Sequence, residues 1–225
     1  DKLSQLVDGT YQGIDAEGQY GNDPYPVLDG TINLTTGAYR DTYDALMTHY
    51  PKLKLNIAKW WIRFEDPEVK RICVENWDKD GDGELSMEEA AAVSSIGTKF
   101  YNIKTDNLSD LKHFKSIKSL PSTSSALSPY FYNTRRIDIP ENVTSLGRYV
   151  LGFNLATVVI FHGKTPPSHD WTFSNTTGTY DTCTPNGCKF YVPDESLETY
   201  KKAFTSNPSP LSGTSIIHPM SEFQE

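Results

Sequence analysis

The sequence predicts an α+β chain in which an N-terminal helical segment caps a short, irregular region of repeated β-strands. Two observations predict this fold class. Apolar residues recur at helical spacing between residues 41 and 114, and from about residue 115 short β-type runs alternate with Pro, Gly, Asn and Ser. We therefore expect a loose arm over 1–40, a helical segment over 41–114 and a β-rich region over 115–225.

Turn and cap signals place the first elements of the chain in order. Residues 1–40 are rich in Gly, Asp and Tyr, which is typical of a loose arm or linker. Asp41 is expected to cap a short helix, and apolar and polar residues then alternate over 53–57 as in a half-buried strand. The tryptophans at 60–61 are expected to pack onto the following helix, with a carbohydrate platform as the alternative.

Two further helices flank an aspartate-rich loop. Asp66 is a strong N-cap and Pro67 suits a first turn, so a helix is expected from there to Trp77. A second helix is expected over 87–96, where a glycine ends it. Ser109 is expected to cap a single helical turn further along the same segment.

The β-rich region contains five short β-type runs. These runs lie at 117–120, 136–139, 157–161, 189–192 and 215–218. The first gaps between them are about 20 residues long, which lies within the range of leucine-rich repeats. The region is therefore expected to form a short, irregular, leucine-rich-repeat-like β solenoid, and Asp194 is expected to cap a helix after the fourth run.

The twelve residues at 78–89 fit the calcium loop of an EF-hand at every diagnostic position. Gly83 permits the sharp turn that this loop needs, and Leu85 is the apolar residue that pins the loop to the core. Calcium requires about six to eight hard oxygen ligands. The expected ligands are the carboxylates of Asp78, Asp80 and Asp82, the backbone carbonyl of Glu84, Ser86 directly or through water, and two oxygens of Glu89. The sequence therefore predicts Ca²⁺ as the cofactor.

Two readings of this loop do not involve a metal. Ser86 and Glu89 form a capping-box pattern, and aspartate-rich turns are common on acidic surfaces. Neither reading explains alternating aspartates that are followed by Gly83 and flanked by helices, and the clustered carboxylates would repel one another without a cation. Because regulatory EF-hands work as pairs and the sequence holds one such loop, the predicted role of the ion is structural.

The cysteines leave one question open. Cys73 lies in an apolar helical context and is expected to be buried. Cys183 and Cys188 bracket a turn sequence, which leaves a local disulfide and two free thiols as alternatives. The scattered histidines show no metal-ligand spacing, so a zinc site is not expected.

Composition and motifs exclude several functional classes. The 225 residues hold 21 Lys and Arg against 29 Asp and Glu, a net charge of −8, so nucleic acid is not an expected partner. No apolar run approaches the length of a transmembrane segment. Nucleophile-elbow, phosphate-loop and zinc-protease motifs are lacking. His162 and His169 lie near Asp170, but loop histidines are more often solvated than catalytic, so the chain is expected not to be an enzyme.

Several segments of the chain resemble one family of bacterial surface proteins. These segments lie at 61–66, 72–77 and 89–93 around the loop, and at 110–114, 136–147 and 191–200. In that order they are similar to the calcium-loop region, the junction, the repeat unit and the usual ending of BspA-like leucine-rich repeat surface proteins of gut-dwelling bacteria. The resemblance covers residues 60–223.

The resemblance implies an extracellular protein held at the cell surface, as an outer-membrane-anchored lipoprotein. Its partner would be a host or envelope protein or glycan, and the candidate contacts are the aromatic residues Tyr130, Tyr132, Trp171 and Tyr180. The expected function is a calcium-stabilised, non-catalytic cell-surface interaction or adhesion protein. The alternative is a dockerin-like or glycan-binding accessory module of a surface polysaccharide system.

Overall fold

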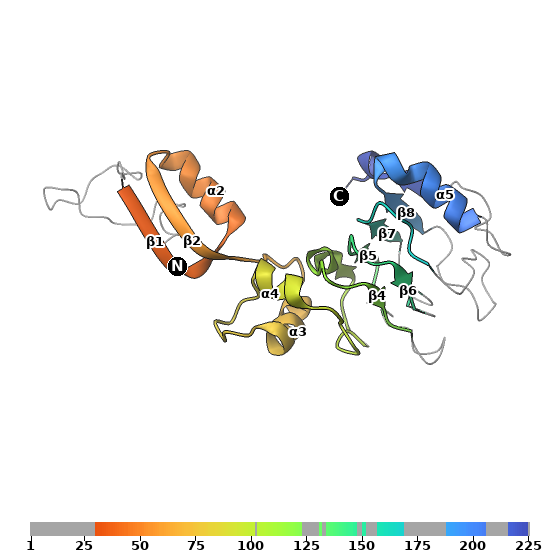
Figure 1. The fold of residues 1–225 in the computed structure, drawn as a ribbon, viewed down its shortest axis with the longest axis horizontal. Coiled ribbons are helices and arrows are strands. Elements are labelled where there is room, and N and C mark those ends of the chain that lie inside the picture. Colours follow the sequence, from red (N-terminus) through yellow and green to blue (C-terminus); the bar gives the residue numbers. More distant parts are fainter. Residues whose placement is uncertain are drawn as a thin grey trace, which may run out of the picture. The chain divides into compact units, whose positions relative to one another are not determined.

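The structure is a computed structural model, and its described residues fall into two compact units (Figure 1). The described residues are 30–101, 103–122, 131, 134–147, 150–151, 157–168, 188–205 and 216–224. One unit comprises the described residues up to Arg63 together with Ser86–Glu88. The other comprises Phe64–Leu85 and the described residues from Glu89 onward.

The first unit is built from a pair of parallel strands and one helix. Strands β1 (Gly30–Tyr39) and β2 (Leu53–Trp61) pair in parallel, and α2 (Arg40–His49) connects them. Parallel strands need such a crossover because the chain must return to the same end of the sheet. Leu46 of α2 and Leu53 of β2 are buried and form part of the core of this unit.

The start of α2 and the end of β2 differ from the predictions. Tyr39 occupies the N-cap position without a side-chain hydrogen bond, and Asp41 lies in the first turn, where it pairs with Arg63 at 2.5 Å. The predicted cap at Asp41 is therefore wrong. The ring of Trp60 lies against Tyr43 of α2 at 5.3 Å between centroids, so this tryptophan packs onto the preceding helix, whereas the sequence predicted packing onto the following one.

Helix α3 (Pro67–Trp77) begins where the sequence predicts. The Asp66 carboxylate accepts hydrogen bonds from the backbone N–H groups of Glu68 and Val69 at 2.8 and 3.0 Å. Its second oxygen accepts a bond from the Thr105 hydroxyl at 2.5 Å. The predicted N-cap is thus confirmed, and it also anchors a segment that lies 39 residues further along the chain.

The next helix is shorter than predicted, and the helical turn after it begins at a different cap. Helix α4 (Met87–Ala92) ends early, and the Ser95 hydroxyl accepts a bond from the backbone N–H of Gly97. Serine side chains compete with helical backbone bonds in this way. A 3₁₀ turn, η1 (Ser109–His113), forms the predicted single turn, although Leu108 is its N-cap.

The second unit contains a parallel sheet with the strand order β3-β5-β7-β8-β9 (Figure 1). Its strands are β3 (Asn107–Leu108), β5 (Arg136–Ile139), β7 (Val158–Phe161), β8 (Lys189–Val192) and β9 (Ile217–Pro219). A separate parallel pair consists of β4 (Ser119–Leu120) and β6 (Ser145–Leu146). Because the five strands run in the same direction, their carboxyl ends meet at one edge of the sheet.

Aromatic side chains form the core between this sheet and the helix that follows β8. The remaining helical elements are η2 (Asp194–Ser196), α5 (Leu197–Thr205) and η4 (Met220–Glu222). The ring centroid of Phe161 lies 5.7 Å from that of Phe190, 5.4 Å from Tyr200 and 5.6 Å from Phe204. All four side chains are buried. Phe161 is therefore the central contact between the sheet and α5.

The predicted fold class is wrong. The described residues do not form an N-terminal helical EF-hand-like segment that caps a leucine-rich-repeat-like β solenoid; they form a mixed α/β structure with mostly parallel sheets and four short α-helices. The first described element is a strand, not a helix. Local patterns missed this architecture because parallel pairing joins distant segments, such as Ile32 with Leu55.

The individual β-type runs were predicted better than the architecture. The runs at 136–139 and 189–192 coincide with β5 and β8, and those at 157–161 and 215–218 overlap β7 and β9. Of the run at 117–120, the last two residues form β4. Strand-forming residues bounded by Pro and Gly are therefore a reliable local signal in this half of the chain.

Gly147 provides a test of the close approach between β4 and β6. Its backbone N–H donates to the Leu120 carbonyl at 2.7 Å, and a Cβ atom on Gly147 would lie 2.1 Å from the Ser122 nitrogen. Gly147→Ala is expected to destabilise the second unit by about 1–3 kcal/mol, because backbone must move to admit the methyl group. Urea unfolding measures this loss, and equal unfolding free energies for the two proteins would contradict it.

Some predictions concern residues on which the structure is silent. The residues in question are Tyr130, Tyr132, His169, Asp170, Trp171, Tyr180 and Cys183, and all lie outside the described residues. Within the described part of the chain, none of the helices has the length and apolar character that a bilayer crossing requires.

Candidate functional site

The predicted calcium loop runs from the end of α3 to the start of α4. Asp78, its first residue, is the C-cap of α3, and its backbone N–H donates to the Val74 carbonyl at 3.3 Å. The last turn of α3 therefore places the first carboxylate of the loop. The N-cap at Asp66 fixes the other end of this eleven-residue helix and so helps to position its last turn.

Three aspartate side chains come together in the loop. Asp78, Asp80 and Asp82 each offer a carboxylate oxygen, and these oxygens lie within 4.8 Å of one another. The two oxygens of Asp78 accept hydrogen bonds from the backbone N–H groups of Gly81 and Gly83 at 2.8 and 2.9 Å. The loop's own amides thus hold this carboxylate in place, and the structure assembles three of the predicted ligands.

Two glycines give the loop its shape. Gly81 has φ of 72° and Gly83 has φ of 85°, both in the left-handed region that other residues adopt with strain. No atom lies within 4 Å of a Cβ built at either position, so the requirement comes from the backbone conformation and not from space. The predicted turn at Gly83 is confirmed, and Gly81 is a second turn residue that the sequence analysis did not single out.

The middle of the loop is fixed to its surroundings by one ion pair and one buried side chain. The Lys70 ammonium of α3 contacts the Glu84 carboxylate at 2.6 Å. The other Glu84 oxygen, Oε2, is buried without a hydrogen-bond partner among the described residues. The loop pattern assigns the backbone carbonyl of Glu84, and not this side chain, as the ligand. Leu85 is fully buried, which confirms that it pins the loop.

Among the described residues, Glu89 is not part of the carboxylate group that the three aspartates form. One Glu89 oxygen accepts the backbone N–H of Lys79 at 2.8 Å, and this bond ties the end of the loop to its beginning. The backbone of Ser86 forms an antiparallel bridge with Trp61, and Ser86 is buried, with 2 % of its surface exposed. To supply two oxygens, the Glu89 carboxylate would have to exchange the Lys79 amide for the ion.

The donor set of this loop suits a hard divalent cation, the class to which calcium belongs. The group consists of carboxylate oxygens, without the nitrogen or sulfur donors that zinc and copper favour. Carboxylates so close together repel one another, and the attraction of each carboxylate to a divalent cation bound between them would offset that repulsion. Asp78, Asp80 and Asp82 would bind such an ion through side chains, and Glu84 through its carbonyl.

Asp110 is a buried carboxylic acid that the sequence analysis did not mark. It is fully buried in η1, and one oxygen accepts the backbone N–H of Glu65 at 3.0 Å. Its other oxygen, Oδ1, has no hydrogen-bond partner among the described residues. Burial, which disfavours the charged form, raises the pKa of Asp110 to about 6.

This shift predicts how stability depends on pH. The folded-state pKa of Asp110 is above its ordinary value of 3.8. The folded state therefore becomes less stable as the pH rises through the interval between these two pKa values, and the loss of stability is complete above about pH 7. Asp110→Asn keeps a carbonyl acceptor without the charge. It is expected to be more stable than the parent by about 2 kcal/mol at neutral pH, with little difference near pH 4.

Thermal unfolding at several pH values measures this effect. Asp106→Asn is the matched control, because Asp106 is an exposed carboxylate in the same part of the chain. The control is expected to show no comparable pH-dependent gain. A difference between Asp110→Asn and the parent that stays constant with pH would show that charge burial is not the cause.

A second polar cluster joins β5 to the end of β7. Asp138 is fully buried, and its carboxylate accepts a hydrogen bond from Arg136 Nε at 2.9 Å and contacts His162 Nε2 at 2.8 Å. The side chains of Arg136 and His162 are partly exposed at 21 % and 31 %. A charged residue inside an apolar strand, as in 136–139, was the sequence signal that could have indicated this cluster.

The two described cysteines are buried, free thiols. Burial raises the pKa of Cys188 to about 12, and it raises that of Cys73 further, so both thiols stay protonated at neutral pH. The burial predicted for Cys73 is confirmed. Cys183, the possible disulfide partner of Cys188, lies outside the described residues.

Comparison with known proteins adds no relative to this picture. No family model, no curated protein and no solved structure in the three comparisons matches the chain. The functional interpretation therefore depends on the residues themselves.

Proposed function

We propose that this chain is a calcium-stabilised interaction or adhesion protein of the cell surface that does not catalyse a reaction. The observation that carries the calcium proposal is the group of carboxylates from Asp78, Asp80 and Asp82, whose oxygens lie within 4.8 Å of one another. The sequence resemblance described above supports the surface role. The lack of a recognisable catalytic motif in the sequence supports a binding function.

The surroundings of the loop favour a structural role for the ion over a regulatory one. Leu85 is buried and the Lys70–Glu84 pair ties the loop to α3, so the loop is fixed at its centre. EF-hand sensors work as pairs of loops that open together, and the described residues contain one carboxylate group of this kind. An ion that binds only the folded loop stabilises the folded state by mass action.

Methionine methyl NMR can test calcium binding at the loop itself. The chain has three methionines, and they lie in separate places: Met47 in α2, Met87 in α4 within the loop sequence, and Met220 in η4. When calcium is added to chelator-treated, [methyl-¹³C]methionine-labelled protein, the Met87 signal is expected to shift because it lies beside the ligands. The Met47 and Met220 signals serve as internal controls.

Two charge-matched variants make this test specific. Asp80→Asn and Glu88→Gln each remove one negative charge from the loop, but only Asp80 belongs to the carboxylate group. Asp80→Asn is expected to weaken calcium binding by about tenfold or more, and Glu88→Gln by far less. An unmoved Met87 signal, or equal losses in the two variants, would contradict the calcium site.

The interaction role needs its own experiment. The full chain, immobilised with and without calcium, is exposed to host mucus and to envelope extract of the producing cell. A partner is expected to bind the calcium-loaded protein and to be lost with the chelator and with Asp80→Asn. If neither source yields a calcium-dependent partner, the interaction role is wrong even where calcium itself binds.

A further inference from the structure

The start of α3 is tied to η1 by the carboxyl group of Asp110. This carboxyl accepts hydrogen bonds from the backbone N–H groups of Glu65, at 3.0 Å, and Asp66. The Thr105 hydroxyl, which precedes η1 by a few residues, donates to the Asp66 carboxylate. The two residues that precede α3 are therefore bonded to the segment 105–110 through two carboxyl groups.

The place of Asp110 in this contact disfavours a negative charge. The residue is fully buried, and its Oδ1 atom has no hydrogen-bond partner among the described residues. An ionised carboxylate in such a place has lost the hydration of one oxygen without a replacement, and the neutral acid loses much less. In an opened state, water reaches both oxygens. A charge on Asp110 therefore favours opening of the contact.

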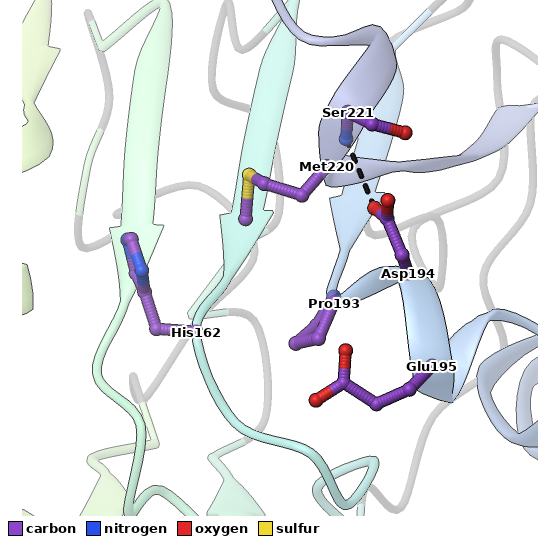
Figure 2. Close-up of a pocket in the computed structure, with 6 residues that line it drawn as sticks. All are labelled: His162, Pro193, Asp194, Glu195, Met220 and Ser221. Carbon is purple, nitrogen blue, oxygen red and sulfur yellow. Dashed lines mark hydrogen bonds between the residues drawn. The ribbon is translucent and has the colours of Figure 1, made fainter.

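Asp194 shows the opposite behaviour in the absence of burial. It lines the pocket drawn in Figure 2, where its carboxylate accepts the backbone N–H of Ser221 at 2.9 Å, and this bond lowers its pKa. The bond from Glu65 acts on Asp110 in the same direction, but desolvation outweighs it and raises the pKa of Asp110 to about 6. Burial, and not hydrogen bonding, thus decides which form of Asp110 is preferred.

The other titratable groups around Asp110 do not remove this preference. Lys112 favours the charged form of the carboxyl and Glu65 opposes it, and each acts less strongly than burial. The Cys73 thiol is protonated, and burial lowers the pKa of His113 to about 4, so neither is charged near neutral pH. These groups come from the residues before α3 (Glu65 and Asp66), from α3 (Cys73), from η1 (Lys112 and His113) and from β5, which contacts η1 (the paired Arg136 and Asp138).

The residues bonded to Asp110 can separate from it without unfolding α3. Glu65 and Pro67 are exposed, so their movement exposes little additional apolar surface. The bonds by which Asp66 caps α3 lie within the helix and do not involve η1. Local opening of a lightly packed segment costs less free energy than unfolding of the whole unit. The start of α3 can therefore open by itself.

We propose that Asp110 forms a pH-sensitive contact at the start of α3, in which the neutral carboxyl holds residues 65 and 66 against η1 and its ionisation favours a local opening that releases them. The pKa of Asp110 is about 6 in the closed state and returns to its ordinary value of 3.8 in the open state. The opening equilibrium therefore rises with pH between these values and levels off above about pH 7. The inference goes beyond the proposed function and uses no residue of the calcium loop.

Hydrogen exchange of individual backbone amides tests the proposal in chelator-treated, ¹⁵N-labelled protein. The Glu65 amide bonds the Asp110 side chain and precedes α3, so its protection reports the contact itself. The Lys70 amide reports the first turn of α3 and the Val158 amide reports the sheet, and each has its own backbone hydrogen bond. In the parent protein, the Glu65 amide is expected to have the largest opening constant of the three.

A ratio of opening constants isolates the contribution of Asp110. The opening constant of the Glu65 amide in the parent, divided by that in Asp110→Asn, is expected to rise about twentyfold from about pH 4.5 to about pH 7.5. The ratio cancels any contribution of His113, which gains a charge in acid if the opening exposes it. For Asp106→Asn, the exposed control, the same ratio is expected to stay constant with pH.

Two results would overturn the proposal. Equal opening constants for the Glu65, Lys70 and Val158 amides of the parent would show that Asp110 is exposed only when the whole unit unfolds, and this comparison needs no variant. A ratio for Asp110→Asn that stays constant with pH would show that the charge on Asp110 does not drive the opening. Because the samples contain no calcium, neither result depends on the calcium site.

Discussion

Removing calcium is expected to lower the melting temperature of this protein by about 5–10 °C. Calcium at a hundredfold excess over its dissociation constant stabilises the folded state by about 2.7 kcal/mol. For a chain of this length, each kcal/mol corresponds to a shift of about 2–4 °C. Differential scanning calorimetry with added calcium and with chelator measures the shift, and Asp78→Ala is expected to abolish it.

The apo proteins need to be compared as well, because Asp78 has a second task. Its carboxylate accepts the N–H groups of Gly81 and Gly83, so Asp78→Ala loses these bonds in the absence of the ion. A lower starting temperature is therefore expected for this variant, in addition to the lost calcium response. Glu88→Gln, the control outside the carboxylate group, is expected to keep the full response. An Asp78→Ala protein with the parent's melting temperature in both conditions would refute a stabilising ion.

Replacing Phe161 with alanine is expected to cost about 3–5 kcal/mol, the largest single loss that we predict for this chain. Its ring lies within 6 Å, between centroids, of the rings of Phe190, Tyr200 and Phe204. Deletion of a buried ring loses the transfer free energy and leaves a cavity that a rigid sheet cannot close. Urea unfolding gives the free energy, and the Met220 signal reports the second unit specifically.

Phe223→Ala is the matched control for this core substitution. Phe223 is half-buried and packs edge-on against Tyr191 at 5.0 Å, at the margin of the same sheet. Its loss removes less buried area and leaves no enclosed cavity, so a clearly smaller destabilisation is expected. If Phe161→Ala cost no more than Phe223→Ala, then Phe161 would not be the central contact between the sheet and α5.

Local signals in the sequence predicted local structure well. The Asp66-Pro67 start of α3 is correct because an N-cap acts on the two or three residues that follow it. The runs at 136–139 and 189–192 are correct because strand-forming residues lie between breakers. The strand β1 was missed because residues 1–40 as a whole are rich in glycine and aspartate. Within the strand itself, Thr, Ile and Leu prevail.

The candidate metal site was predicted in part for the same reason. Asp78, Asp80 and Asp82 lie within five residues, and Gly81 and Gly83 give the backbone its turn, so their meeting depends on local backbone alone. Glu89 depends on where a helix begins, and the structure directs it to the Lys79 amide. Asp138 and His162 are 24 residues apart and meet only through strand pairing, which local patterns do not report.

The hydrogen bonds within the loop have one further consequence. The amides of Gly81 and Gly83 already bond Asp78 before any ion is present, and Lys70 already holds Glu84. When a loop is preorganised, little of the free energy of ion binding is lost to ordering the loop. A ligand shifts a conformational equilibrium only by its preference for one state over another. Calcium binding would therefore stabilise the conformation that the loop already has and would not switch the loop to another conformation.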